Sequence, residues 1–278
     1  MKKINRRSFL AAAGLTAAAL ALTACGGSAS STASSTASSA ASSEAASTSA
    51  AAELTTVEAG KLTMATNAAF PPYEMTTDAG EFEGIDIDTA KAIAEKLGLE
   101  LQIDDMDFDA ALLSVQQGKA DIVMAGVTVT DERKAVMDFS DSYATGIQSI
   151  IVPEGSDIAS PDDLAGKKIG TQRGTTGYIY CSDDFGDDNV VAYDDGLTAV
   201  QALNNGQVDA VVIDNAPAQE FVAANPGLKI LDTSYAEEDY AIGMAKNSPL
   251  EDAINSTLEE LKADGTLQAI VDKYITAE

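Results

Sequence analysis

The chain has 278 residues and a formal net charge of −27, from 44 acidic and 17 basic side chains. A surface this acidic argues against nucleic acids and anionic lipids as partners. The absence of histidine excludes histidine-based catalytic triads and histidine-ligated zinc sites.

The first 24 residues are typical of an export signal. Four basic residues precede an apolar, alanine-rich stretch from Phe9 to Leu22, which is too short for a membrane span. The tetrapeptide LTAC that ends at Cys25 resembles a lipobox, and this resemblance implies that Cys25 is diacylated and becomes the mature N-terminus. We therefore expect a lipoprotein signal peptide over 1–24 and a lipid anchor on the extracytoplasmic face of the cell membrane. Cleavage elsewhere is the alternative.

The export route stays open, because NRRSFL also resembles a twin-arginine signal beside the favoured general secretory route. Residues 26–52 are almost wholly Ser, Ala and Thr. Such a stretch has no periodic apolar face to pack, so we expect a lipidated cysteine and a disordered tether over 25–56.

Strands and helices alternate after the tether. The first series predicts strands over 61–66, 99–103 and 122–124, and helices over 86–97 and 108–117. Gly98 is placed to end the first helix, and Thr130 to cap a short helix with acidic residues in its first turn.

A second series follows Pro153. It predicts a helical turn at 162–164, strands over 168–171, 190–193 and 211–213, and helices from 175, over 197–205 and over 217–224. A last strand is expected over 240–245. Ser248 and Glu251 form an apparent capping box for a long helix that closes at Gly265.

Alternating strands and helices predict an α/β fold with mainly parallel sheets. The simplest arrangement has two lobes, with lobe 1 formed by 57–150 and 236–278 and lobe 2 by 151–235. Crossovers near 148–153 and 231–240 would join the lobes as a hinge, and a cleft would open at the carboxyl ends of the strands.

A short echo marks equivalent points in the two series. Residues 116–123, QQGKADIV, resemble residues 204–211, NNGQVDAV, with Asp121 matching Asp209. Each copy runs into a buried strand, and the strands are followed by different charges, Arg133 in one series and Asp214 in the other. A cation from one lobe and an anion from the other predict a site for a zwitterion.

Several longer motifs identify a family. TNAAFPPYEM, FEGIDIDTAKAIAEKLG, ADIVMAGVTVTDERK, MDFSDSY, GKKIGTQRGTTG and VDAVVIDNAPA occur in this order over residues 61–278. They resemble the polar amino acid-binding lipoproteins of ATP-binding-cassette importers, solute-binding protein family 3. The resemblance implies a type II periplasmic-binding-protein-like fold, a free amino acid as ligand, and a permease with its ATPase subunits as partners. It implies a monomer without cofactor, metal or catalysis.

The resemblance also implies residue roles around the ligand's backbone. Arg133 would grip the α-carboxylate through its planar fork, supported by Thr128, the Gly126 backbone and Thr176. Asp214 would bind the α-ammonium. The alternatives are an ordinary surface ion pair for Arg133, a helix cap at Thr176, and local backbone bonds for Asp214.

Around the ligand's side chain, the family places Phe70 and Phe108 as flanking aromatics and Asn67 and Gln172 as polar contacts. Both amides are neutral, which favours a polar uncharged ligand, although the aromatics would also accept a basic amino acid by cation–π contact. Tyr73 is expected in the core.

Two other functions compete with transport. Cyclohexadienyl dehydratases resemble this fold, and without histidine such an enzyme would need a carboxylate as its acid or base. A ligand sensor that docks to a receptor is the second. The acidic runs at 104–109 and 183–188 lack the spacing of a calcium loop.

Overall fold

The computed structural model describes residues 54–275. The predicted signal peptide, the lipidated Cys25 and all but the last three residues of the predicted tether lie outside the described residues. Between residues 54 and 275, no helix has the length and apolar character needed to cross a membrane.

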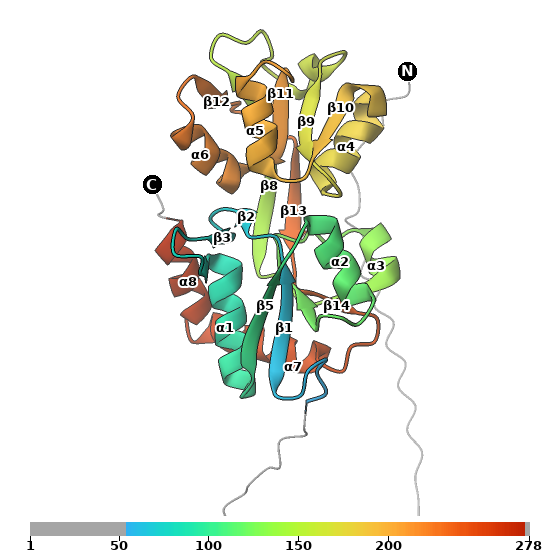
Figure 1. Ribbon diagram of the computed structural model, residues 1–278, viewed down its shortest axis with the longest axis vertical. Helices are drawn as coiled ribbons and strands as arrows, with labels where there is room; N and C mark the ends of the chain where they lie inside the picture. Colours follow the sequence, from blue (N-terminus) through green and yellow to red (C-terminus); the bar gives the residue numbers. More distant parts are fainter. Residues whose placement is uncertain (1–53, 276–278) are drawn as a thin grey trace, which may run out of the picture. The chain divides into compact units, whose positions relative to one another are not determined.

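The described chain forms two lobes, each built on a mixed sheet (Figure 1). The first sheet has the order β5-β1-β6-β14-β7, with β1 (Lys61–Thr66), β5 (Glu100–Asp105), β6 (Ile122–Val123), β7 (Met137–Phe139) and β14 (Gly243–Ala245). The second has the order β10-β9-β11-β8-β12, with β13 also paired to β8; its strands are β8 (Ala144–Pro153), β9 (Ile169–Gln172), β10 (Val190–Tyr193), β11 (Ala210–Asp214), β12 (Leu228–Ile230) and β13 (Ala236–Tyr240). The predicted two-lobed α/β fold is confirmed.

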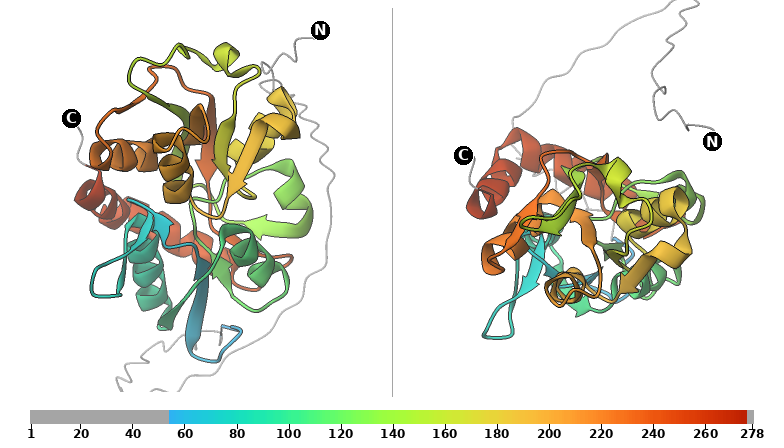
Figure 2. Two further views of the ribbon diagram at one scale, coloured as in Figure 1. Left: turned by 45° about the horizontal axis from the view of Figure 1, so that its top comes forward. Right: turned by 90° about the horizontal axis from the view of Figure 1, so that it is seen from above.

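Helices cover both faces of each sheet (Figure 2). In the first lobe, α1 (Ile85–Leu97), α7 (Glu251–Ala263) and α8 (Thr266–Tyr274) pack together on one side, and α2 (Phe108–Gln116) packs on the other. In the second lobe, α5 (Gly196–Asn204) and α6 (Asn215–Ala224) cover one face, and α4 (Thr176–Phe185) the other. The short α3 (Asp131–Val136) lies beside β7.

Each sheet contains three parallel strands in the same order, β5-β1-β6 and β10-β9-β11. The two lobes thus repeat one unit, with β1-α1-β5-α2-β6 matching β9-α4-β10-α5-β11. The remaining pairs are antiparallel, with β14 beside β6 and β8 beside β11. The prediction of mainly parallel sheets therefore describes the repeated units and not the strands added to them.

The echoed aspartates have the same structural task in both lobes. Asp121 Oδ2 accepts the Thr63 N–H at 2.8 Å, and Asp209 Oδ2 accepts the Lys168 N–H at 2.8 Å. Each aspartate returns a bond from its own N–H, to the carbonyls of Thr63 and Lys168 respectively. Each pair fastens the start of β6 or β11 to its neighbouring strand, so the echo belongs to the scaffold.

The two crossovers form a paired ribbon. β8 and β13 run antiparallel between the lobes, with Ala144 opposite Tyr240 and Gln148 opposite Ala236 (Figure 1). The predicted lobe limits at residues 150 and 235 stay a prediction; the first falls inside β8 and the second just before β13.

The structure confirms two predicted helix ends and corrects the prediction for the C-terminal segment. Gly98 ends α1 in the left-handed conformation, and the Thr130 hydroxyl caps α3. The capping box at Ser248 is wrong, because its hydroxyl accepts the Leu250 N–H in the turn before α7. The chain then continues past Gly265 into α8, for which no bounds were predicted.

Three short strands lie between β1 and α1, where no strand was predicted. β2 (Ala69–Phe70), β3 (Glu74–Thr76) and β4 (Phe82–Glu83) form a small sheet. This sheet brings one acidic side chain, Glu74, against the cleft.

Candidate ligand-binding site

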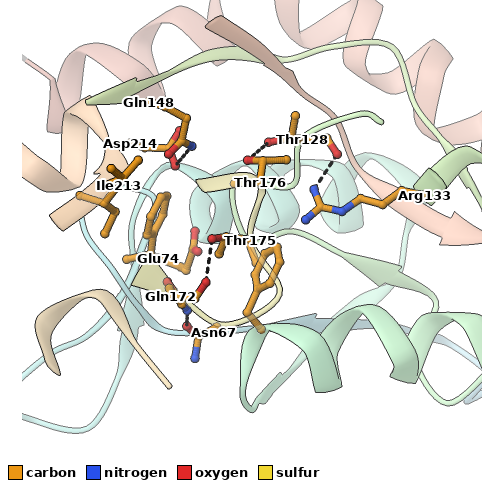
Figure 3. Close-up of a pocket in the computed structure, with 15 residues that line it drawn as sticks. Asn67, Glu74, Thr128, Arg133, Gln148, Gln172, Thr175, Thr176, Ile213 and Asp214 are labelled. Atoms are coloured by element: carbon orange, nitrogen blue, oxygen red, sulfur yellow. Dashed lines mark hydrogen bonds between the residues drawn. The ribbon is translucent and has the colours of Figure 1, made fainter. Parts of the chain in front are cut away.

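A pocket lies between the two lobes and is lined by residues of both. All nine side chains and backbone positions predicted to contact a ligand line it: Asn67, Phe70, Phe108, Gly126, Thr128, Arg133, Gln172, Thr176 and Asp214. Figure 3 labels six of them, Asn67, Thr128, Arg133, Gln172, Thr176 and Asp214, and shows how they lie. Each lies at or beyond the carboxyl end of a parallel strand, where the repeated units of both lobes meet.

Arg133 is a buried cation that has no directly bonded anion. Arg133 is only 8% exposed. Its Nη1 donates to the Thr128 carbonyl at 2.7 Å, and its Nη2 donates to the Gly174 carbonyl at 3.2 Å. The guanidinium carbon lies 5.3 Å from the centre of the Phe108 ring. None of the ion pairs formed within residues 54–275 includes Arg133.

Burial lowers the pKa of Arg133, and the charge of Glu238 opposes this effect most. A guanidinium keeps its charge even so, because its ordinary pKa is so high. The alternative of a surface pair with Asp131 or Glu132 is not what the structure shows, since both acids are exposed and the guanidinium lies in the pocket. The site therefore offers a desolvated cation with free donors to an anion.

Asp214 is the opposite case, a buried anion without a cation. It ends β11, is 8% exposed, and accepts bonds from Gln148 Nε2 at 2.8 Å and from the Tyr240 hydroxyl. Burial raises its pKa from 3.8 to about 7, and the charge of Glu238 acts in the same direction. No ion pair among the described residues includes Asp214.

Glu238 binds both hydroxyls that were predicted to hold a ligand. Its Oε2 atom accepts the Thr128 hydroxyl at 3.1 Å, the Thr176 hydroxyl at 3.0 Å and Gln148 Nε2 at 3.0 Å. The two hydroxyl oxygens lie 3.4 Å apart. Because a hydroxyl has one hydrogen, both oxygens present lone pairs to any further partner.

Thr175 is the N-cap of α4, since its hydroxyl accepts the Tyr178 N–H. Thr176 is the first residue of the helix, and its hydroxyl is turned to Glu238. Its side chain therefore serves the pocket and not the helix end.

Asn67 and Gln172 close the pocket across the lobes. Gln172 Nε2 donates to Asn67 Oδ1 at 2.8 Å, and Asn67 Nδ2 donates to the Met106 carbonyl at 3.0 Å. Both residues are buried. The two amides thus satisfy each other where they meet.

Aromatic side chains link the pocket to the hinge. Phe70 stacks on Tyr73 with ring centres 5.9 Å apart, and Tyr73 meets Tyr240 edge-on at 5.3 Å. Tyr73 lies in the core, as expected, and not on the pocket wall. The three rings thus form a continuous aromatic contact from the pocket to Tyr240 on β13.

Gly126 is required by its backbone and its surroundings. Its φ is +55°, and a Cβ would lie 2.9 Å from the Phe70 ring. Its N–H donates to Asp86 Oδ2 at 3.0 Å, so this donor is already engaged. Asp86 also accepts the Tyr143 hydroxyl at 2.8 Å, and burial raises the pKa of Asp86 to about 6.

Sequence reasoning missed polar groups of the site that do not follow a strand end. Gln148 and Glu74 line the pocket from β8 and the small sheet, and Glu238 on β13 bonds to the lining residues Thr128, Thr176 and Gln148. One signal was available, because alternation along 236–240 places Glu238 on the same face as the buried Tyr240. Within the described part of the chain, no cluster of acidic or cysteine side chains could hold a metal ion.

Comparison with known proteins identifies the family. Residues 62–277 match the model for bacterial extracellular solute-binding proteins, family 3. The chain belongs to this family. Among its relatives, a probable histidine-binding protein of Neisseria gonorrhoeae is 32% identical over 99% of this chain and 98% of its own length.

Solved structures of arginine-binding proteins share the same fold. A mutant of the arginine-binding protein of T. maritima is 40% identical, with a TM-score of 0.75 over 78% of this chain and 96% of that one. An ancestral arginine-binding protein bound to glutamine is 43% identical, with a TM-score of 0.75 over 78% of this chain and 99% of that one. The two-lobed solute-binding fold is therefore common to all three.

Proposed function

We propose that this family 3 solute-binding protein captures a polar amino acid outside the cytoplasm and delivers it to an ATP-binding-cassette importer. One observation carries the proposal: Arg133 is a buried cation without a bonded anion, and Asp214 is a buried anion without a cation. An α-amino acid supplies both missing charges. The relatives named for histidine and arginine binding support an amino acid as the ligand.

The α-carboxylate binds the Arg133 guanidinium and the amino-terminal end of α4 at Thr176, where helix N–H groups favour an anion. The α-ammonium binds Asp214. The Thr128 and Thr176 hydroxyls keep their bonds to Glu238 and offer their lone pairs to the ammonium. A carboxylate could take these hydroxyl hydrogens only by displacing Glu238.

Ligand binding stabilises the closed state. Arg133 belongs to the first lobe and bonds the Gly174 carbonyl of the second, while Thr128 and Thr176 approach each other across the same boundary. A ligand that contacts Arg133 and Asp214 together has its full set of bonds only when the lobes close. Its differential affinity then shifts the population toward closure.

The closed form docks on a membrane permease whose ATPase subunits drive uptake. The protein is monomeric and is held at the outer face of the cell membrane by lipid on Cys25. None of the pocket groups is assigned a catalytic role. Turnover of arogenate or prephenate by the purified protein would contradict this part of the proposal.

The test is a calorimetric titration after a thermal-shift screen of the twenty amino acids, because a bound ligand stabilises the native state. Arg133→Ala should weaken binding at least about 100-fold through loss of charge-assisted bonds. Arg173→Ala is the matched control, since Arg173 is exposed and pairs with Asp194. Unchanged affinity in Arg133→Ala would remove the carboxylate from this position.

A further inference from the structure

Glu238 is a buried acid of the β8–β13 ribbon that bonds to side chains of both lobes. It lies in β13 and is 6% exposed. Its Oε2 atom accepts the Thr128 hydroxyl at 3.1 Å, the Thr176 hydroxyl at 3.0 Å and Gln148 Nε2 at 3.0 Å. Figure 3 shows Thr128 and Thr176 facing each other beside Arg133. One carboxylate oxygen thus gathers a donor from each lobe and a third from the other strand of the ribbon.

The bond from Thr128 belongs to the attachment of the first lobe to the ribbon. Two backbone hydrogen bonds flank this residue, from the Val129 N–H to the Asp239 carbonyl at 3.0 Å and from the Ala241 N–H to the Val127 carbonyl at 3.1 Å. The backbone on either side of Thr128 is therefore fixed to β13 next to Glu238. Rotation of the second lobe about the ribbon leaves Thr128 beside Glu238.

The bond from Thr176 crosses between the lobes. Thr176 is the first residue of α4, which packs on β9, β10 and β11 of the second sheet. Its hydroxyl reaches Glu238 on the stretch of β13 to which the first lobe is attached. The bond from Arg133 Nη2 to the Gly174 carbonyl crosses the same boundary at 3.2 Å. When the second lobe rotates away from the first, α4 moves with it and the Glu238–Thr176 bond breaks.

This crossing bond places a helix end that the ligand uses. The proposed function assigns the α-carboxylate to Arg133 and to the amino-terminal end of α4, which belong to different lobes. Among the described residues, Thr128 and Thr176 line the pocket and Glu238 does not. The negative charge of Glu238 would also repel a carboxylate. Glu238 therefore acts on the ligand through Thr176 and not by direct contact.

We propose that Glu238 is a positioning residue, which holds the amino-terminal end of α4 beside Arg133 in the closed state and thereby slows release of the ligand. This inference rests on the proposed function, in which Arg133 and α4 share the carboxylate. Because the Glu238–Thr176 bond forms only as the lobes close, its loss should destabilise the closed complex. The first encounter of the ligand with the open protein should not change, so the effect belongs to the dissociation rate constant.

Stopped-flow kinetics of the purified protein tests the proposal. The probes are L-arginine and L-histidine, the amino acids in the names of two relatives, or another amino acid that the thermal-shift screen finds. Glu238→Met keeps a side chain of similar length and removes the charged acceptor. It should raise the dissociation rate constant about 10- to 100-fold, the range for a hydrogen bond to a charged group, with the association rate constant unchanged. Glu237→Met, an exposed neighbour on β13, is the matched control and should release the ligand at the unaltered rate.

A double-mutant cycle separates positioning from a direct contact with the ligand. Thr176→Val removes the hydroxyl and keeps the N–H groups of the helix end. If the hydroxyl acts through Glu238, Thr176→Val should speed release from the unaltered protein and add little in the Glu238→Met background. Additive effects on the dissociation rate constant would overturn the inference. Unchanged or slower release from Glu238→Met would overturn it as well, because slower release would mean that the acid opposes the ligand.

The kinetic measurement also guards against damage to the fold. A misfolded fraction lowers the calorimetric stoichiometry and leaves the dissociation rate constant of the folded fraction unchanged. Should Glu238→Met not fold, Glu238→Gln takes its place. It keeps a neutral acceptor and should speed release by a smaller factor, because a hydrogen bond to a neutral group is weaker; release at the unaltered rate would then overturn the inference.

Failure of the proposed function gives a different result. If none of the twenty amino acids binds the unaltered protein, the proposed function fails, and small-angle X-ray scattering of the ligand-free protein decides the inference by itself. Glu238→Met should have a larger radius of gyration than Glu237→Met, because its closed state lacks a bond between the lobes. Equal radii would overturn the inference in that case.

Discussion

Replacing Asp214 with Asn should stabilise the ligand-free protein above neutral pH and destabilise it in acid. Burial raises the pKa of Asp214 from 3.8 to about 7. As pH rises, the unfolded chain loses this proton first, so the carboxyl group lowers folding stability progressively between about pH 4 and pH 7. A shift of this size corresponds to about 4 kcal/mol at most above pH 7.

The substituted asparagine would not titrate, but its amide cannot accept bonds from both Gln148 and Tyr240. The lost hydrogen bond costs about 1 kcal/mol at every pH. Asp214→Asn should therefore gain up to about 3 kcal/mol at pH 8 and lose about 1 kcal/mol near pH 4. Urea unfolding at the two pH values measures the difference, with Asp188→Asn as an exposed control in the same lobe.

The same variant should bind its ligand poorly. Loss of the charged partner should weaken an amino acid about 10- to 100-fold, and a deaminated analogue of that amino acid much less. Equal losses for both ligands would remove the ammonium from Asp214. A variant destabilised by the same amount at both pH values would refute the argument from burial.

Three further substitutions test the hinge ribbon and the scaffold. Gly146→Ala would place a Cβ 2.5 Å from ring atoms of Tyr240, so overpacking should lower the free energy of unfolding by about 1–3 kcal/mol. Thermal unfolding measures this loss, with the exposed Thr145→Ala as the control. An unchanged melting temperature would show that the β8–β13 ribbon accommodates the added methyl group. Asp121→Asn should lower the free energy of unfolding by about 1–3 kcal/mol, and Asp209→Asn by less. The reason is that Asp121 is buried and accepts two backbone N–H groups, whereas Asp209 is exposed and accepts one. Equal losses for the two variants in urea unfolding would contradict this reasoning.

The sequence was most informative where a strand ends in a polar group. Apolar runs such as 61–66 and 190–193 became β1 and β10 with the expected bounds. The groups that follow such runs, among them Arg133 and Asp214, meet in one pocket because parallel strands point their carboxyl ends the same way. Local patterns suffice for this part of the site.

Long-range strand pairing decides the parts of the fold and of the site that the sequence did not predict. The apolar run 240–245 was expected as one strand, but the chain changes sheets at Ala241, whose N–H bonds to the Val127 carbonyl. Gln148 lines the pocket and bonds to Glu238 because β8 and β13 pair with each other. Glu74 lies in strands of two or three residues, which are too short to show a period.

The hydrogen bonds of Asp121 and Asp209 to the neighbouring strands affect how the ligand preference of such a protein can evolve. They sit at the starts of β6 and β11, whereas the charges of the pocket follow the ends of the same strands. The groups that hold each sheet together and the groups that line the pocket thus lie at opposite ends of the strands. Substitutions at the carboxyl ends can change the ligand preference while the contacts at the amino ends still assemble the lobes, so this architecture separates the evolution of specificity from the maintenance of the fold.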